Sequence, residues 1–314
     1  MTPHLAAAAY GACLPKPGEA GVVHTVFRRA CNLCFGDRLL VLLAPDLPLV
    51  SWGVRLSALP RPFTELAAAG MPCHLEAGAL LVGDRLAVDL QPARLWTGDR
   101  LVPKVTGSAA ASGQAQAAAW CSLRIIAAKR GWPGLCVLLA PAGQRVTRPA
   151  SRLDAVLFAV AGEAVSTLQK ARRENDTAAA VRAARHLAGL GPGLTPAGDD
   201  FLGGYLAGLF IQTPPARGTF AQAFARGLAT ALPPGQPDVG HMFLTQACRG
   251  SFSEHLAALA AAMSTGTAAR VRLEYYASQM LSFGATSGAD TLAGLLAAGP
   301  PAATTGADGR RPGT

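Results

Sequence analysis

The sequence has few aromatic and few charged residues: Phe, Trp and Tyr make up 6% of its 314 residues, and Asp, Glu, Lys and Arg make up 15%. The net charge is +9, but the lysines and arginines are scattered along the chain. Nucleic-acid binding needs a basic stripe interleaved with aromatic side chains, and a membrane-spanning helix needs about 20 consecutive apolar residues. Neither pattern occurs in this sequence. We therefore expect no nucleic-acid or membrane partner, and small anionic substrates or an acidic protein partner instead.

Several common catalytic motifs are also missing. The sequence contains no Walker A motif, no G-x-G-x-x-G after a strand and no G-x-S-x-G nucleophile elbow. Its seven cysteines are an odd, scattered set, which argues against a disulfide framework and favours a reducing, cytoplasmic location. Cys31 and Cys34 have the spacing of half a zinc site, but no second pair follows. We therefore predict buried strand cysteines and no metal site.

The pattern of apolar residues changes along the chain. Residues from about 20 to 105 alternate like strands, with a buried strand at RLLVLLAP and a hairpin that turns at Gly83 and Asp84. After the small-residue segment TGSAAASG, the spacing becomes helical. Helices are expected at 114–129, 152–171, 218–231, 240–263, 267–283 and 288–298, with one more capped at Asp176 that ends at Gly189.

The predicted fold class is α+β, with a mainly-β N-terminal domain followed by an all-helical C-terminal domain that carries two glycine-rich loops. Half of the residues are apolar, which is enough for a full core, and the length favours two domains. The predicted domains are 1–107, which is mainly β, and 108–299, which is helical. Residues 300–314 are rich in proline and glycine and lack apolar anchors, so we expect a disordered tail.

The most informative segment is GLGPGLTPAGDDFLGG, residues 189–204. Its glycines permit positive φ angles and leave backbone amides uncovered, while Pro192 and Pro196 stiffen the chain between them. A loop of this kind at a helix N-terminus binds anions or phosphate, because its free amides and the helix dipole point the same way. The alternative is structural: Gly189 ends one helix and Asp199 caps the next.

A weaker copy of this pattern, GATSGADTLAG, occupies residues 284–294. The sequence G-x-D-x-L-x-G runs from Gly198 to Gly204 and again from Gly288 to Gly294. In each copy the aspartate lies in the first turn of a helix. The last glycine lies on the same face of that helix, and because it has no side chain another backbone can approach it closely. We infer that the two helices pack together and bring both loops to one cleft. Chance similarity between two alanine-rich helices is the alternative.

Carboxylates and hydroxyls on these two segments are the main candidate site residues. Two adjacent aspartates cannot both cap one helix, so the second is free to orient a substrate amide or to hold a hydrated magnesium ion. An arginine near the loop can grip a bound anion, although a cation at a helix C-terminus also fits the helix dipole. No cofactor is expected, and magnesium stays open as an alternative. The candidate catalytic residues are Asp199, Asp200, Asp290 and His24, and the candidate substrate-binding residues are Gly191, Gly193, Leu194, Thr195, Gly198, Thr286, Ser287, Gly288, Asn32 and Arg185.

Four motifs resemble a bacterial family that includes the AllH-type subunit of oxamate carbamoyltransferase. They are GLGPGLTPAGDDFLGG at 189–204, GATSGADTLAGLL at 284–296, VHTVFRRACNL at 23–33 and ACRGSFSEHL at 247–256. The resemblance implies a subunit of a multi-component carbamoyltransferase of purine or allantoin catabolism. It also implies an FdrA-like partner related to acyl-CoA synthetases and a third subunit. The implied reaction interconverts oxalurate plus phosphate with oxamate plus carbamoyl phosphate, and the resemblance assigns no catalytic residues.

Three hypotheses follow. In the first, the chain is an enzyme subunit whose glycine loops bind carbamoyl phosphate, oxamate or a related anion, while loop amides and Thr195 stabilise developing negative charge. In the second, it is a non-catalytic scaffold whose glycines are helix-packing devices. In the third, it is a kinase or hydrolase that depends on phosphate and on a metal held by the paired aspartates. His241 and His255 flank a segment that we interpret as a helix restart and not as a metal site.

Overall fold

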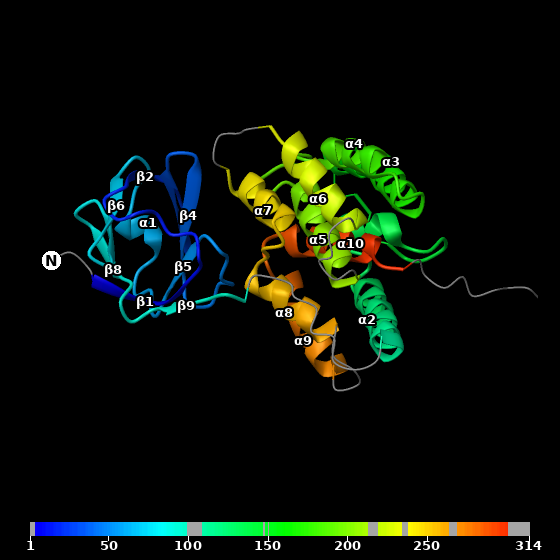
Figure 1. Ribbon diagram of the computed structural model, residues 1–314, viewed down its shortest axis with the longest axis horizontal. Helices are drawn as coiled ribbons and strands as arrows, with labels where there is room; N and C mark the ends of the chain where they lie inside the picture. Colours follow the sequence, from blue (N-terminus) through cyan, green and yellow to red (C-terminus); the bar gives the residue numbers. More distant parts are fainter. Residues whose placement is uncertain are drawn as a thin grey trace, which may run out of the picture.

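The computed structural model describes residues 4–98, 109–146, 148–149, 151–212, 219–233, 238–263 and 269–300. An N-terminal unit of strands stands beside a C-terminal unit of helices (Figure 1). The predicted boundary between residues 107 and 108 and the predicted tail, apart from Pro300, lie outside the described residues. The division into domains therefore stays a prediction.

Eight strands of the N-terminal unit close into a barrel. Their order is β5-β4-β3-β2-β6-β7-β8-β1, and β1 also pairs with β5, which completes the ring. The pairs β4–β5 and β8–β1 are parallel and the other six are antiparallel, while β9 adds to β1 in parallel outside the ring. The elements are β1 (His4–Tyr10), β2 (Ala20–Val26), β3 (Ala30–Phe35), β4 (Arg38–Leu43), β5 (Gly53–Leu56), α1 (Phe63–Leu66), β6 (Pro72–Glu76), β7 (Ala79–Val82), β8 (Leu86–Asp89) and β9 (Arg94–Leu95).

Strand β4 is buried on both of its faces, which explains its unbroken apolar sequence RLLVLL. Leu40 and Leu42 point into the barrel core. The alternate residues Leu39, Val41 and Leu43 belong to a second cluster, which Met242 and Phe243 of the helical unit cover. The hairpin predicted at Gly83 and Asp84 forms between β7 and β8.

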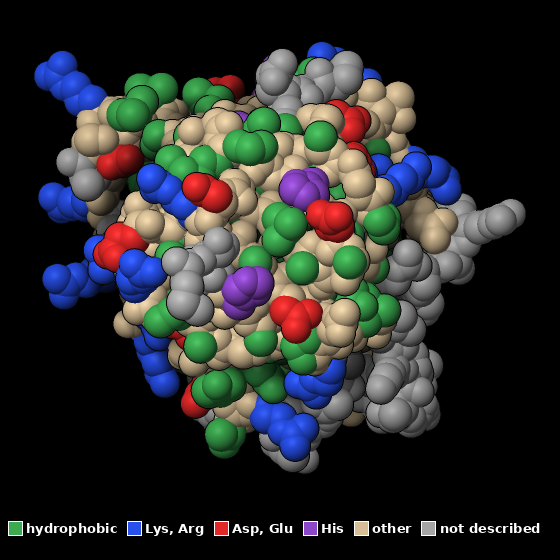
Figure 2. All heavy atoms as spheres, turned by 90° about the vertical axis from the view of Figure 1, so that its left-hand side faces the viewer, with side chains coloured by type: hydrophobic (Ala, Val, Ile, Leu, Met, Phe, Trp, Pro, Cys, Tyr) green, Lys and Arg blue, Asp and Glu red, His purple; other side chains and the backbone are tan. Residues whose placement is uncertain are grey.

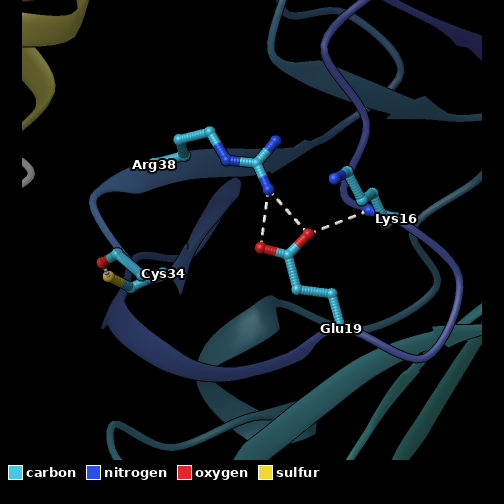
Figure 3. Close-up of polar contacts among 5 residues, drawn as sticks. Lys16, Glu19, Cys34 and Arg38 are labelled. Carbon is cyan, nitrogen blue, oxygen red and sulfur yellow. Dashed lines mark hydrogen bonds and ion pairs between the residues drawn. The ribbon is translucent and has the colours of Figure 1, made fainter.

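An ion pair ties the segment before β2 to the start of β4 (Figure 3). The Arg38 guanidinium donates to both carboxylate oxygens of Glu19 at 2.6 Å, and the Lys16 amide donates to the same group at 2.9 Å. Both hydrogen bonds lower the pKa of Glu19, and the one from Arg38 has the larger effect. The Cys34 thiol donates to the carbonyl oxygen of Gly36 in the adjoining turn.

The helical unit is built around two central helices, α5 and α10 (Figure 1). Both are apolar on nearly all sides, because other helices surround them. The elements are α2 (Ala109–Lys129), the 3₁₀ helix η1 (Gly134–Leu139), α3 (Arg152–Arg173), α4 (Thr177–Leu187), α5 (Ala197–Gln212), α6 (Phe220–Ala231), α7 (Val239–Cys248), α8 (Glu254–Met263), α9 (Ala269–Leu281) and α10 (Ser287–Ala298).

The predicted fold class is wrong in one respect, because the helical unit does not carry two glycine-rich loops. The first segment is a loop with positive φ angles at Gly189, Gly191 and Gly193. In the second segment only Gly284 has a positive φ, and Gly288 already lies inside α10. The closure of the strands into a barrel was also missing from the prediction.

The helix predicted over 240–263 is two helices, α7 and α8. Gly250 has a φ of 77°, in the left-handed region, which ends α7 and lets the chain turn before α8 begins at Glu254.

The barrel face turned away from the helices carries mixed charges (Figure 2). Lysine and arginine side chains lie mainly toward the edges of this view, with acidic, histidine and hydrophobic side chains between them. Among the described residues, no helix is long and apolar enough to cross a membrane.

Candidate functional site

Helices α5 and α10 touch backbone to backbone at their glycines. A β-carbon built on Gly204 would lie 1.9 Å from the carbonyl oxygen of Thr291, and one built on Gly294 would lie 1.8 Å from that of Phe201. Gly208 similarly packs on Ala298, so the contacts advance in the same direction along both helices. The helices therefore run parallel, and their N-termini lie at the same end. This close packing is the physical role of the final glycine in each G-x-D-x-L-x-G copy.

The first glycine of each copy also serves packing. A β-carbon on Gly198 would lie 1.8 Å from the carbonyl oxygen of Leu187, and one on Gly288 would lie 1.8 Å from that of Met280. These two positions were predicted to bind substrate as parts of open loops. Instead, a neighbouring carbonyl covers each of them, although Gly288 also borders the pocket described below.

The loop before α5 is held at its base and open at its tip. The Gly189 amide donates to Asp199 Oδ1 at 2.7 Å, and the Gly198 amide donates to the carbonyl oxygen of Leu190 at 2.9 Å. At the tip, the amides of Gly191, Gly193, Leu194 and Thr195 make no hydrogen bond with the described residues. Free amides in a loop beside a helix N-terminus are the donors that an anion requires.

The two adjacent aspartates of α5 have different surroundings. Asp199 is buried, accepts from Gly189, and has its Oδ2 against Gly240 at the start of α7. Burial raises the pKa of Asp199, although the Gly189 hydrogen bond opposes this. Asp199 therefore closes the loop.

Asp200 has one carboxylate oxygen, Oδ2, that is fully buried and has no hydrogen-bond partner among the described residues. Burial raises the pKa of Asp200 to about 8, and the nearby Ser287 and Thr195 hydroxyls lower it by less. Those two hydroxyls lie 2.8 Å apart and join the loop to the start of α10. Asp200 is therefore a proton-bearing group near neutral pH whose enclosed oxygen has no internal partner.

Asp290 is the counterpart of Asp200 on α10. It is 1% exposed, and its Oδ1 accepts from the Leu135 amide of η1 at 2.7 Å. Its Oδ2 is buried without a partner among the described residues. Burial raises the pKa of Asp290 to about 6, although hydrogen bonds from Leu135 and Thr286 act to lower it. The charge of Asp290 in turn raises the pKa of Asp200, so the two carboxyls of the repeat lie close enough to interact.

A pocket of about 60 Å³, here called the central pocket, opens beside Asp200. Its walls come from α5, α7, α8, α9 and α10, with Pro48 contributed by the barrel. His255, at the start of α8, lines this pocket, and its Nδ1 is buried without a hydrogen-bond partner in the described structure. Burial lowers the pKa of His255. Its motif, ACRGSFSEHL, carries part of the family resemblance, but the sequence predicted only a helix restart at His255.

The barrel fixes the start of α8, where His255 lies. The Glu254 amide donates to the carbonyl oxygen of Leu49, and the Leu49 amide donates back to Glu254 Oε2 at 3.1 Å. Arg55 Nη1 donates to the same carboxylate oxygen at 2.5 Å. Three hydrogen bonds thus tie the residue next to His255 to the barrel.

The predicted site residues that line the central pocket are Asp199, Asp200 and Gly288, and three of the others lie on β2, β3 and α4. His24 is exposed on β2, and Asn32 is buried on β3 with its side-chain amide donating to Thr25 at 2.7 Å. Arg185 is exposed in the last turn of α4. None of His24, Asn32 and Arg185 lines the pocket beside Asp200, so the structure assigns them no part in this site. Thr286 lies at the start of α10 and donates a hydrogen bond to Asp290. Among the described residues, no three His, Cys, Asp or Glu side chains are arranged so that they could hold a metal ion.

Comparison with protein families matches both units of the structure. Residues 187–299, which include α5, α8 and α10, match the family described as Oxamate carbamoyltransferase subunit AllH. Residues 6–95, which form the barrel, match the AllH family N-terminal domain. The chain is thus one of the carbamoyltransferase subunits, and it belongs to the AllH family. The resemblance inferred from the four motifs is confirmed. Comparisons with curated proteins and with solved structures give no match.

Proposed function

We propose that this chain binds reacting molecules within an oxamate carbamoyltransferase and that its site lies where the N-termini of α5 and α10 meet. The observation that carries the proposal is the buried, unpartnered oxygen of Asp200 beside a loop with free amides. A buried polar atom without a partner costs about 1–3 kcal/mol of stability. A ligand that supplies the missing hydrogen bond accounts for this cost.

The proposed reaction interconverts oxalurate plus phosphate with oxamate plus carbamoyl phosphate. A phosphate oxygen attacks the carbamoyl carbon of oxalurate, the carbon–nitrogen bond breaks, and the oxamate nitrogen leaves with a proton. Asp200 in its protonated form gives that proton to the leaving nitrogen and is reprotonated from the phosphate hydroxyl. The free amides around Gly193 hold the phosphate and neutralise part of its charge.

The alternative of a metal-dependent kinase or hydrolase has less support. Magnesium prefers ionised carboxylates in an open octahedral arrangement. Asp199 is already bound to Gly189, and the raised pKa of Asp200 favours its neutral form. We therefore propose a transfer reaction in which these aspartates hold no metal ion.

The scaffold alternative explains the packing of Gly204 and Gly294 but not the unpartnered Asp200 oxygen. We favour the enzyme subunit for this reason. The proposed partners are an FdrA-like subunit related to acyl-CoA synthetases and a third carbamoyltransferase subunit.

Co-expression with these partner subunits tests the proposal. The purified complex, supplied with oxalurate and phosphate, is expected to form carbamoyl phosphate, and a preparation without this chain is expected to form none. Equal formation of carbamoyl phosphate without the chain would leave it as a dispensable or purely structural component.

A further inference from the structure

The central pocket is apolar over most of its wall. Phe243, Phe252, Leu256, Met280 and Phe283 all line it. Such walls repel water and disfavour a buried charge, which costs far more to desolvate than a neutral polar group. The chemistry of any ligand inside the pocket is therefore decided by the few polar atoms that face it.

Two of the residues that line the pocket each carry a buried polar atom without a partner within the described residues: Asp200, with Oδ2, on α5 and His255, with Nδ1, on α8. They come from helices far apart in the sequence and line the same small volume. Burial favours the neutral form of both groups, because it raises the pKa of Asp200 to about 8 and lowers that of His255. A neutral acid and a neutral imidazole together offer one hydrogen-bond donor and one acceptor.

We propose that the central pocket binds the uncharged primary carboxamide end of the substrate, with Asp200 and His255 as its two hydrogen-bond partners. A carboxamide has one carbonyl oxygen that accepts and one NH₂ group that donates, which matches the pair. Asp200 is the partner of the amide nitrogen, which it protonates in the transfer step, and His255 Nδ1 donates to the carbonyl oxygen when it carries the ring proton. This inference rests on the proposed function and names the part of the substrate that enters this pocket.

The size of the pocket agrees with this assignment. A water molecule needs about 10–15 Å³ of such space, so 60 Å³ holds several waters or a ligand of a few heavy atoms. A carboxamide and the carbon next to it fit this volume. A carboxylate of the same shape would bring a negative charge between apolar walls, and this is unfavourable.

Oxamate and oxalate form a matched pair of probes, because oxalate has a carboxylate in place of the amide. Calorimetric titration of the full chain, and of the complex with its partner subunits, is expected to give oxamate at least about tenfold tighter binding than oxalate. Equal affinity for the two, or no oxamate binding to either preparation, would overturn the inference. This comparison uses the wild-type protein and does not depend on any variant folding.

Variants then assign the two hydrogen bonds. Asp200→Leu and His255→Phe each remove the polar atoms and are expected to weaken oxamate binding about three- to tenfold. Asp200→Asn keeps one donor and one acceptor in the same place and should retain most of the affinity. His186→Phe, at an exposed histidine of α4, is the matched control and should leave binding unchanged. Unchanged oxamate affinity in both Asp200→Leu and His255→Phe would contradict the assignment.

The outcome separates this inference from the proposed function. Selective oxamate binding by a complex that forms no carbamoyl phosphate would support the amide pocket and reject the transfer reaction. Carbamoyl phosphate formation by a complex that binds oxamate and oxalate equally would support the transfer reaction and reject the amide pocket.

Discussion

Adjacent residues with the same side chain take different roles at the start of α5. Asp199 accepts a hydrogen bond from Gly189 and closes the glycine loop, whereas Asp200 keeps one enclosed oxygen without an internal partner. The difference follows from helix geometry, because neighbouring residues on a helix point about 100° apart. The chemistry that we propose therefore rests on the second aspartate of the pair, and the first supports the loop.

The raised pKa of Asp200 predicts that the protein loses stability as the pH rises. Between the ordinary value of 3.8 and about 8, the folded protein holds a proton that the unfolded chain has released. The free energy of unfolding therefore falls across this interval. Asp290, whose pKa is about 6, and Asp199 shift in the same direction and add to the slope.

Melting temperatures of the wild type and of Asp200→Asn, measured between about pH 5 and pH 8, test this prediction. The variant should show a clearly shallower fall, because its amide does not titrate. Identical pH profiles would mean that Asp200 is ionised in the folded protein.

At the level of elements, the repeated glycines let α5 and α10 lie in backbone contact. Their shared motif predicted that the helices pack and bring their N-termini together, and the parallel packing at Gly204 and Gly294 agrees with this. The motif did not indicate that Gly198 and Gly288 also pack against preceding carbonyls, since a glycine that permits positive φ and a glycine that admits a neighbour look the same in sequence. For the same reason the second segment was mistaken for an open loop.

Gly204→Ala is predicted to destabilise the protein by about 1–3 kcal/mol or more, because the added methyl meets the carbonyl of Thr291. Its matched control is Gly203→Ala on the same helix, where a β-carbon has no atom within 4 Å. That change should stabilise by about 0.5–1 kcal/mol through helix propensity. Chemical denaturation measures both values, and a Gly204→Ala variant as stable as Gly203→Ala would show that the helices are not in backbone contact.

Over the whole molecule, the site depends on contacts that local patterns do not encode. The apolar run of β4 and the turn at Gly83 were predictable, because each depends on a short stretch of sequence. The pairing of β1 with β5 and the pocket that Pro48 and His255 both line join distant segments, so neither was predicted. His255 was overlooked for this reason, since its neighbours in the pocket come from other elements.

The ion pair between Arg55 and Glu254 is the contact through which the barrel positions His255. Arg55→Met keeps the apolar stem of the side chain and removes the hydrogen bond to Glu254. We expect a loss of about 1 kcal/mol in stability, because both side chains are partly exposed, and a fall of about tenfold in carbamoyl transfer by the complex.

Arg38→Met is the control for this change, because it removes a comparable ion pair, with Glu19, inside the barrel unit. Transfer by the Arg38→Met complex should equal that of the wild type. Equal transfer by Arg55→Met as well would mean that the barrel does not position the pocket.

The central claim is that Asp200 takes part in carbamoyl transfer, and the most direct test is carbamoyl phosphate formation by complexes that contain wild-type chain or Asp200→Asn. Asparagine keeps the size and the hydrogen bonds of a protonated aspartate but cannot pass on a proton. We predict that the rate falls by at least about a hundredfold, while the melting temperature of the chain changes by only a few degrees. A variant that keeps full activity, or one that unfolds at the assay temperature, would contradict the claim and make Asp200 a structural residue of a scaffold subunit.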